Sequence, residues 1–217
     1  MAFRRKIIRL DWISVAIVLV VLILVSSVTA IAQNRMPPIP ADKMTPEQKK
    51  ALEDFLGARG TLTGPWVALL RSPDLMTRTR GISDYLRFKS ALPPRLSEFV
   101  ILMTARQYTQ QYEWNAHYQL AMAGGLKPEI AKAIAEGRRP EHMAEDEGIL
   151  YDFCMELHRN QSVSDVTYAR ALSKFGEQGV IDTVSITGYY VMISMILNTV
   201  RTPLPEGVAP ALGNFPR

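Results

Sequence analysis

The sequence predicts an all-α protein, and three features of its pattern support this. Apolar residues recur at steps of three and four in successive segments, which is the spacing of one helix face. Ser, Thr or Pro begins most of these segments, and Gly ends several of them, as is typical of helix termini. No segment shows the apolar–polar alternation, bounded by turn residues, that a half-buried strand requires. We therefore expect a helical bundle.

Thr45 predicts the start of the first helix. It precedes Pro46, which suits the first helical position, and it stands three residues before Gln48, the spacing of a capping box. This helix should end near Gly57. After a glycine-containing loop, Pro65 is expected to open a short apolar turn.

Ser72 and Pro73 predict the start of the next helix. Residues at helical spacing follow along it, at Leu75, Thr79, Ile82 and Leu86. The pair Pro93-Pro94 should end this helix and begin another, which runs from about Arg95 to Thr109.

The second half of the chain predicts five more helical segments. Gly124-Gly125 supplies a stop signal for the first of them, and Ser164 caps the fourth. The last is the most apolar. The segments are expected at residues 113–123, 128–137, 145–159, 165–175 and 181–200.

The first 32 residues resemble an export segment. Four basic residues precede an apolar run from Ile13 to Val25, and Ala30-Ile31-Ala32 offers the small residues of a cleavage site. Because no charge falls between Trp12 and Ala32, an uncleaved membrane anchor fits as well. Either interpretation places the domain in the periplasm or otherwise outside the cytosol, with membrane contact only through this segment.

The rest of the chain divides into a Pro-rich linker at residues 33–44, a helical domain at 45–207 and an extended tail at 208–217. Residues 1–32 hold four basic and one acidic residue, and so contribute +3 of the net charge of +4. The domain is therefore nearly neutral, which argues against nucleic-acid binding. The one cysteine, Cys154, excludes both an intramolecular disulfide and a C-x-x-C redox pair.

Glu98 is the first candidate for chemistry. Ile101, Leu102 and Ala105 follow it at three, four and seven residues, so its carboxylate should lie on an apolar helix face. Burial would raise its pKa, which suits a general acid or base. The alternative is a structural glutamate paired with an arginine.

Glu113 and His117 are the second candidate. They stand four residues apart on one predicted helix, so their side chains share a face. A carboxylate beside an imidazole orients the ring and supports its protonated form. The alternative is a histidine that is buried only for packing.

These residues resemble a known family. Glu98, the run Tyr112-Glu113-Trp114-Asn115-Ala116-His117, and Gly124-Gly125-Leu126 are similar to the carboxymuconolactone decarboxylase family, which has the alkylhydroperoxidase D-like fold. Flanking segments at residues 64–66, 72–75, 197–199 and 203–207 extend the resemblance over about residues 64–207.

The resemblance implies a reaction class. Peroxidase members of the family carry a C-x-x-C pair where this chain has Gln110 and Glu113, so thiol peroxidase chemistry is not expected. Decarboxylase-like members carry glutamate and histidine, which implies cofactor-independent acid–base chemistry, in the manner of a lyase, on a small carboxylic acid or lactone. Glu98, Glu113 and His117 would be the catalytic residues. Arg106 is a weaker candidate for binding a substrate carboxylate.

Three further expectations complete this interpretation. The resemblance implies a homotrimer or homohexamer, and the apolar last helix fits such an assembly. It implies no metal, although two carboxylates and an imidazole could bind a divalent ion. The alternative to an enzyme is a non-enzymatic helical oligomer that binds a small ligand or a partner protein in the same fold.

Overall fold

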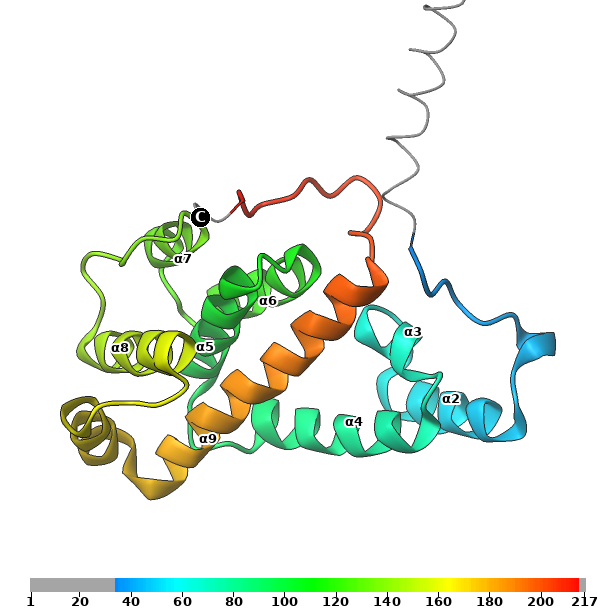
Figure 1. Ribbon diagram of the computed structural model, residues 1–217, viewed down its shortest axis with the longest axis horizontal. Helices are drawn as coiled ribbons and strands as arrows, with labels where there is room; N and C mark the ends of the chain where they lie inside the picture. Colours follow the sequence, from blue (N-terminus) through cyan, green and yellow to red (C-terminus); the bar gives the residue numbers. More distant parts are fainter. Residues whose placement is uncertain (1–33, 215–217) are drawn as a thin grey trace, which may run out of the picture. The chain divides into compact units, whose positions relative to one another are not determined.

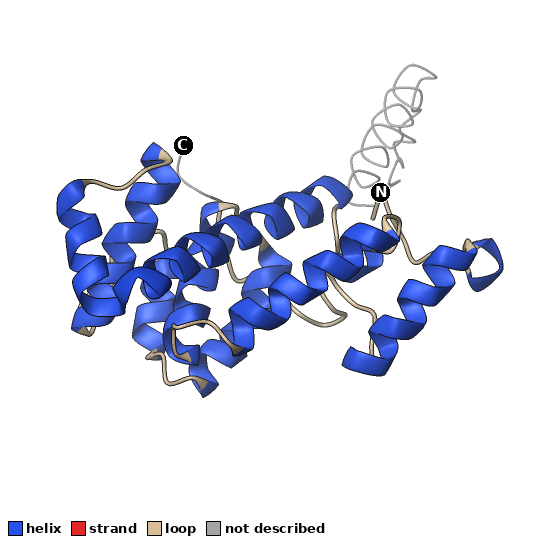
Figure 2. Cartoon of the chain, turned by 90° about the horizontal axis from the view of Figure 1, so that it is seen from below, coloured by secondary structure: helices blue, strands red, loops and turns tan. Residues whose placement is uncertain are grey.

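The computed structural model describes residues 34–214, and residues 35–214 of these belong to one compact unit. The predicted export segment at residues 1–32 lies outside the described residues. Within residues 34–214 all regular structure is helical (Figure 2). A short 3-10 helix, η2 (Ala41–Lys43), lies in the predicted linker.

Eight α-helices follow along the described chain (Figure 1). They are α2 (Pro46–Arg59), α3 (Pro65–Leu69), α4 (Pro73–Phe88), α5 (Pro94–Gln107), α6 (Gln111–Ala123), α7 (Pro128–Ala135), α8 (Glu145–Asn160) and α9 (Asp165–Val200).

Local signals set most helix ends as predicted. At the start of α2, Gln48 N donates to Thr45 Oγ1 at 3.2 Å and Thr45 N donates to Gln48 Oε1 at 3.1 Å, which completes the capping box. At the start of α9, Thr167 N donates to the Ser164 hydroxyl at 3.3 Å.

The buried face of α4 differs from the predicted one. Leu75 and Ile82 are 44% and 50% exposed, whereas Met76, Thr79, Ser83 and Leu86 are buried. Thr79 and Leu86 thus agree with the predicted spacing, whereas the inward face also includes Ser83, which lines a cavity described below. Hydrophobic spacing alone could not reveal a buried face that is half hydroxyl.

Helix α9 joins two segments that the sequence predicts as separate helices. They meet at Gly176, whose φ of 68° and ψ of 178° are not helical and place a kink there. By length and composition α9 could cross a bilayer, but 56% of its most apolar stretch is buried inside the domain, and core helices pass the same test.

Helix α5 forms the centre of the domain. It packs against α6, α7, α8 and α9, which surround it (Figure 1). Every residue from Leu96 to Arg106 is buried, so even its polar residues are held inside. This position brings Glu98 into the core.

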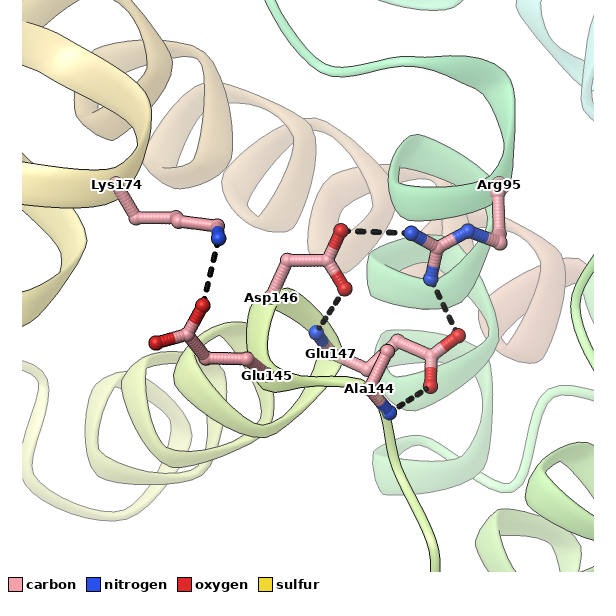
Figure 3. A network of polar contacts seen from close by, with 6 residues as sticks. All are labelled: Arg95, Ala144, Glu145, Asp146, Glu147 and Lys174. Atoms are coloured by element: carbon pink, nitrogen blue, oxygen red, sulfur yellow. Dashed lines mark hydrogen bonds and ion pairs between the residues drawn. The ribbon is translucent and has the colours of Figure 1, made fainter.

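A network of ion pairs ties the start of α8 to α5 (Figure 3). Arg95 donates to Asp146 at 2.6 Å and also donates to Glu147. Glu147 is 4% exposed and accepts a second hydrogen bond from Ala144 N at 2.9 Å. Lys174, on the neighbouring α9, pairs with Glu145 at 2.7 Å.

The C-terminal tail is tied to the domain. Gln111 Oε1 accepts hydrogen bonds from Ala211 N and Leu212 N, both at 3.0 Å. The Leu212 side chain is buried, and Arg106 Nη1 donates to Gly213 O at 2.7 Å. The tail is therefore extended but packed.

Candidate active site

Helices α5 and α6 bring Glu98, Glu113 and His117 together in the domain interior. The three residues are 6%, 3% and 6% exposed. His117 Nδ1 lies 2.6 Å from Glu98 Oε2, and His117 Nε2 lies 3.4 Å from Glu113 Oε2. Each ring nitrogen thus faces a carboxylate.

The two distances differ in kind. The 2.6 Å contact is a short charge-assisted hydrogen bond, which fixes the ring from the neighbouring helix. The 3.4 Å contact lies beyond the usual N–H···O range, so Nε2 is held less tightly on the Glu113 side. That side is the one on which a ligand could take over the contact.

The carboxylates keep His117 protonated at neutral pH. Burial alone would lower the pKa of His117, but hydrogen bonds and charges from Glu113 and Glu98 outweigh it and raise the pKa to about 9. At pH 7 the ring is an imidazolium with an acidic N–H at each nitrogen.

Two tyrosines of α9 enclose the imidazole. The Tyr190 ring meets His117 edge to face, with ring centroids 5.0 Å apart, and Tyr189 packs on Tyr190 at 5.1 Å. Burial raises the pKa of Tyr189 to about 12 and that of Tyr190 well above its usual value. Both phenols are therefore neutral at pH 7.

Glu113 and His117 line a cavity of about 260 Å³. Residues of α2, α3, α4, α6 and α9 form its wall, with apolar surface from Phe55, Trp66 and Ile193. Glu98 does not line the cavity but lies against His117. The arrangement thus offers one imidazolium and one carboxylate to a ligand, with a second carboxylate holding the imidazolium in place.

Arg106 does not line this cavity, contrary to the sequence-based expectation. It follows Glu98 by eight residues, which places it about 12 Å along α5 and turned by about 80°. Its guanidinium instead reaches the C-terminal tail at Gly213.

Two arginines that the sequence analysis missed, Arg59 of α2 and Arg87 of α4, line the cavity instead. Arg59 pairs with Asp84 and donates to Ser83 Oγ at 3.3 Å. The only sequence signal was the four-residue step from Ser83 to Arg87, which puts a hydroxyl and a guanidinium on one helix face.

Gln110 and Glu113 occupy the positions at which the resemblance places the cysteines of peroxidases, and here both have other contacts. Gln110 caps α6, because its Oε1 accepts from Tyr112 N at 2.6 Å, while its Nε2 donates to Asn198 Oδ1 at 2.8 Å. The lone Cys154 does not line the cavity, and burial raises its pKa to about 12. Among residues 34–214, no group of three or more His, Cys, Asp or Glu side chains has an arrangement that could hold a metal ion.

A solved structure shares this architecture. It is described as an alkylhydroperoxidase AhpD core, an uncharacterized peroxidase-related protein from Ralstonia eutropha JMP134. The match has a TM-score of 0.66 and 16% identity, and it covers 79% of this chain and 92% of the other. The chain has the alkylhydroperoxidase D-like fold.

The predicted fold class is therefore confirmed, while an identity of 16% shows the fold alone. No family model matches the sequence. No curated protein matches it either.

Proposed function

We propose that this protein is an exported, decarboxylase-like enzyme of the alkylhydroperoxidase D-like fold that performs acid–base chemistry on a small carboxylic acid or lactone without thiol redox. One observation carries the proposal. A buried imidazole, held between two carboxylates, lies in the wall of a cavity. Sites of this kind, with strongly perturbed titratable groups, are typical of catalytic centres.

We propose a different role for each of the three residues. Glu113 faces the cavity and acts as the base that removes a proton from a carbon next to a carbonyl. His117 donates its Nε2 hydrogen to the oxygen on which negative charge develops. Glu98 lies behind the ring, keeps it oriented and stabilises its positive charge.

The carbanion formed in this way can accept a proton at another carbon, which is isomerisation. Alternatively, an equivalent carbanion forms when the C–CO₂ bond breaks and CO₂ leaves, and the carbon then takes up a proton from solvent, which is decarboxylation. Only isomerisation uses Glu113 as the base, whereas both reactions use His117 to stabilise the developing negative charge, and neither requires a thiolate.

Hydrogen exchange tests the proposal. Small carboxylic acids and lactones are incubated with the protein in D₂O, and NMR follows the loss of protons next to the carbonyl. We expect exchange with the wild-type protein and a loss of at least about 100-fold in the H117Q variant. Equal exchange rates in the two proteins, for every compound that binds, would overturn the acid–base role and favour a non-enzymatic binding protein.

We also propose that the protein forms a homotrimer or homohexamer. An apolar groove of about 570 Å³ lies along α3, α4 and α9, and it includes Leu75 and Met195, which are 44% and 51% exposed. Contiguous apolar surface of this kind is typical of subunit interfaces. Sedimentation at micromolar concentration should show an assembly larger than a monomer, and a monomer alone would refute the proposal.

A further inference from the structure

The cavity contains an arginine that has no carboxylate partner among residues 34–214. Arg87, in the last turn of α4, lines the same cavity as Glu113 and His117. Its Nε is buried and has no hydrogen-bond partner, and no carboxylate within residues 34–214 forms an ion pair with it. Its guanidinium lies over the ring of Phe88, 5.0 Å from the ring centroid. Since no carboxylate of the described residues balances this cavity-lining guanidinium, an anionic acceptor from outside the chain would stabilise it.

Arg59 provides a comparison within the same cavity. It pairs with Asp84, donates to Ser83 and lies over the ring of Trp66 at 5.4 Å. The protein therefore provides Arg59 with its own carboxylate partner. Asp84 forms an ion pair with Arg59, but no carboxylate of the described residues forms one with Arg87. This contrast indicates that Arg87 is available to bind a ligand.

We infer that Arg87 binds the carboxylate of the substrate, and that the substrate is a small monocarboxylate. The Nε–H and Nη–H groups of a guanidinium form a planar fork that matches the two oxygens of a carboxylate. This inference rests on the proposed function, and it names the substrate class for that same site.

The charges in the cavity favour a single negative charge on the ligand. Asp84 balances Arg59, and Glu98 balances the imidazolium of His117. Arg87 is the remaining cation and Glu113 the remaining anion. One carboxylate on Arg87 is therefore neutralised, whereas a second would lie near Glu113 without a cation.

The cavity also limits the size and polarity of the ligand. Its volume of about 260 Å³ is below the range of sites for drug-sized ligands, which is about 300–1,000 Å³. Phe55, Trp66 and Ile193 add apolar wall, which suits a ring or a short chain between the two polar ends. Because loss of the carboxylate would leave Arg87 without an anion again, this group is retained. Of the two reactions proposed above, such a substrate undergoes isomerisation, with the proton transfer at a carbon closer to His117.

Binding of simple probes tests the inference without knowledge of the natural substrate. Benzoate is a flat monocarboxylate, benzamide is its neutral analogue, and isophthalate carries a second carboxylate. Calorimetry on the wild-type protein should show benzoate binding about 10- to 100-fold more tightly than benzamide, and also more tightly than isophthalate. Equal affinity for benzoate and benzamide would overturn the inference without any variant.

A variant pair assigns the effect to Arg87. R87Q removes the charge and should weaken benzoate binding about 10- to 100-fold while leaving the affinity for benzamide nearly unchanged. R78Q is the matched control, because Arg78 is an exposed arginine of the same helix outside the cavity. It should bind benzoate as the wild-type protein does.

The same probes separate this inference from the proposed function. H117Q should still bind benzoate, since Arg87 remains in place, although proton exchange is lost. Unchanged benzoate affinity in R87Q would overturn the carboxylate site and leave the acid–base role of His117 intact. Loss of exchange in H117Q, together with weakened benzoate binding in R87Q, would support both.

Discussion

His117 Nδ1 lies 2.6 Å from Oε2 of Glu98, and this contact joins two helices across the centre of the domain. Glu98 is on α5 and His117 is on α6, and these two helices form the most extensive helix contact in the described chain. The position and the protonation of the candidate catalytic ring therefore depend on the packing of this pair of helices.

The first prediction concerns the charge on Glu98. In E98Q the amide can still hydrogen-bond to His117, but the negative charge is gone. Loss of a charge-assisted hydrogen bond of about 1.5–3 kcal/mol corresponds to about one to two pH units. We expect the pKa of His117 to fall from about 9 by that amount.

NMR titration of ¹⁵N-labelled imidazole measures this shift directly. E129Q is a suitable control, because Glu129 is exposed on α7. An E98Q protein in which His117 titrates at the wild-type pH would show that Glu98 does not set the charge of the ring.

The second prediction concerns stability and pH. The folded-state pKa of His117, about 9, exceeds its usual value of 6.5, so the folded protein holds this proton more tightly than the unfolded chain. The stabilisation is fully present below pH 6.5 and is lost as pH rises through about 9. It amounts to at most about 3 kcal/mol.

Urea unfolding at several values between pH 6.5 and pH 9 measures this loss as a fall in the free energy of unfolding. In H117Q the slope over the same interval should be much smaller. A wild-type slope no steeper than that of H117Q would contradict the raised pKa.

Sequence patterns predicted those helix ends that depend only on neighbouring residues. Thr45 and Ser164 cap their helices, and Gly124 ends α6, because capping needs only neighbouring residues. The buried face of α4 and the environment of His158 depend on distant elements. His158 is half-buried with Nε2 3.3 Å from Thr104 Oγ1, and burial lowers its pKa to about 4.

In the candidate site, too, some residues could be predicted from local sequence and others could not. Helical periodicity placed Glu98 on an inward face and put Glu113 beside His117, and the family resemblance suggested that the two helices meet. Arg59 and Arg87 come from α2 and α4, whose approach to α6 no spacing within the sequence reveals. Arg106 is close to Glu98 in sequence but lies outside the cavity. The wall of the cavity is instead formed by helices that are far apart in sequence.

The third prediction concerns Gly64, next to the cavity. Its φ of 58° and ψ of −132° are open only to glycine, and an added Cβ would lie 2.5 Å from Cε1 of Tyr112, a residue of the cavity wall. We expect G64A to lower the free energy of unfolding by about 1–3 kcal/mol and to weaken ligand binding by displacing Tyr112.

G81A is the matched control. Gly81 lies within α4, and an added Cβ would meet nothing within 4 Å. Replacing a helical glycine by alanine should raise the free energy of unfolding by about 0.5–1 kcal/mol. Chemical denaturation of both variants checks the pair, and similar stability of G64A and G81A would refute the argument.

The fourth prediction concerns the ion pairs at the start of α8 (Figure 3). R95M keeps an unbranched apolar side chain but removes both ion pairs of Arg95, and it leaves Glu147 buried with Ala144 N as its remaining hydrogen-bond donor. Because an unpaired buried carboxylate is costly, we expect a loss of about 2–3 kcal/mol in the free energy of unfolding.

K174A removes the neighbouring pair with Glu145, whose side chain is 77% exposed, and it should change the urea midpoint little. The cost of R95M should also shrink in the double variant R95M/E147Q, because the buried charge is then absent. If K174A were as destabilising as R95M, or if the double variant regained nothing, burial of Glu147 would not be the source of the effect.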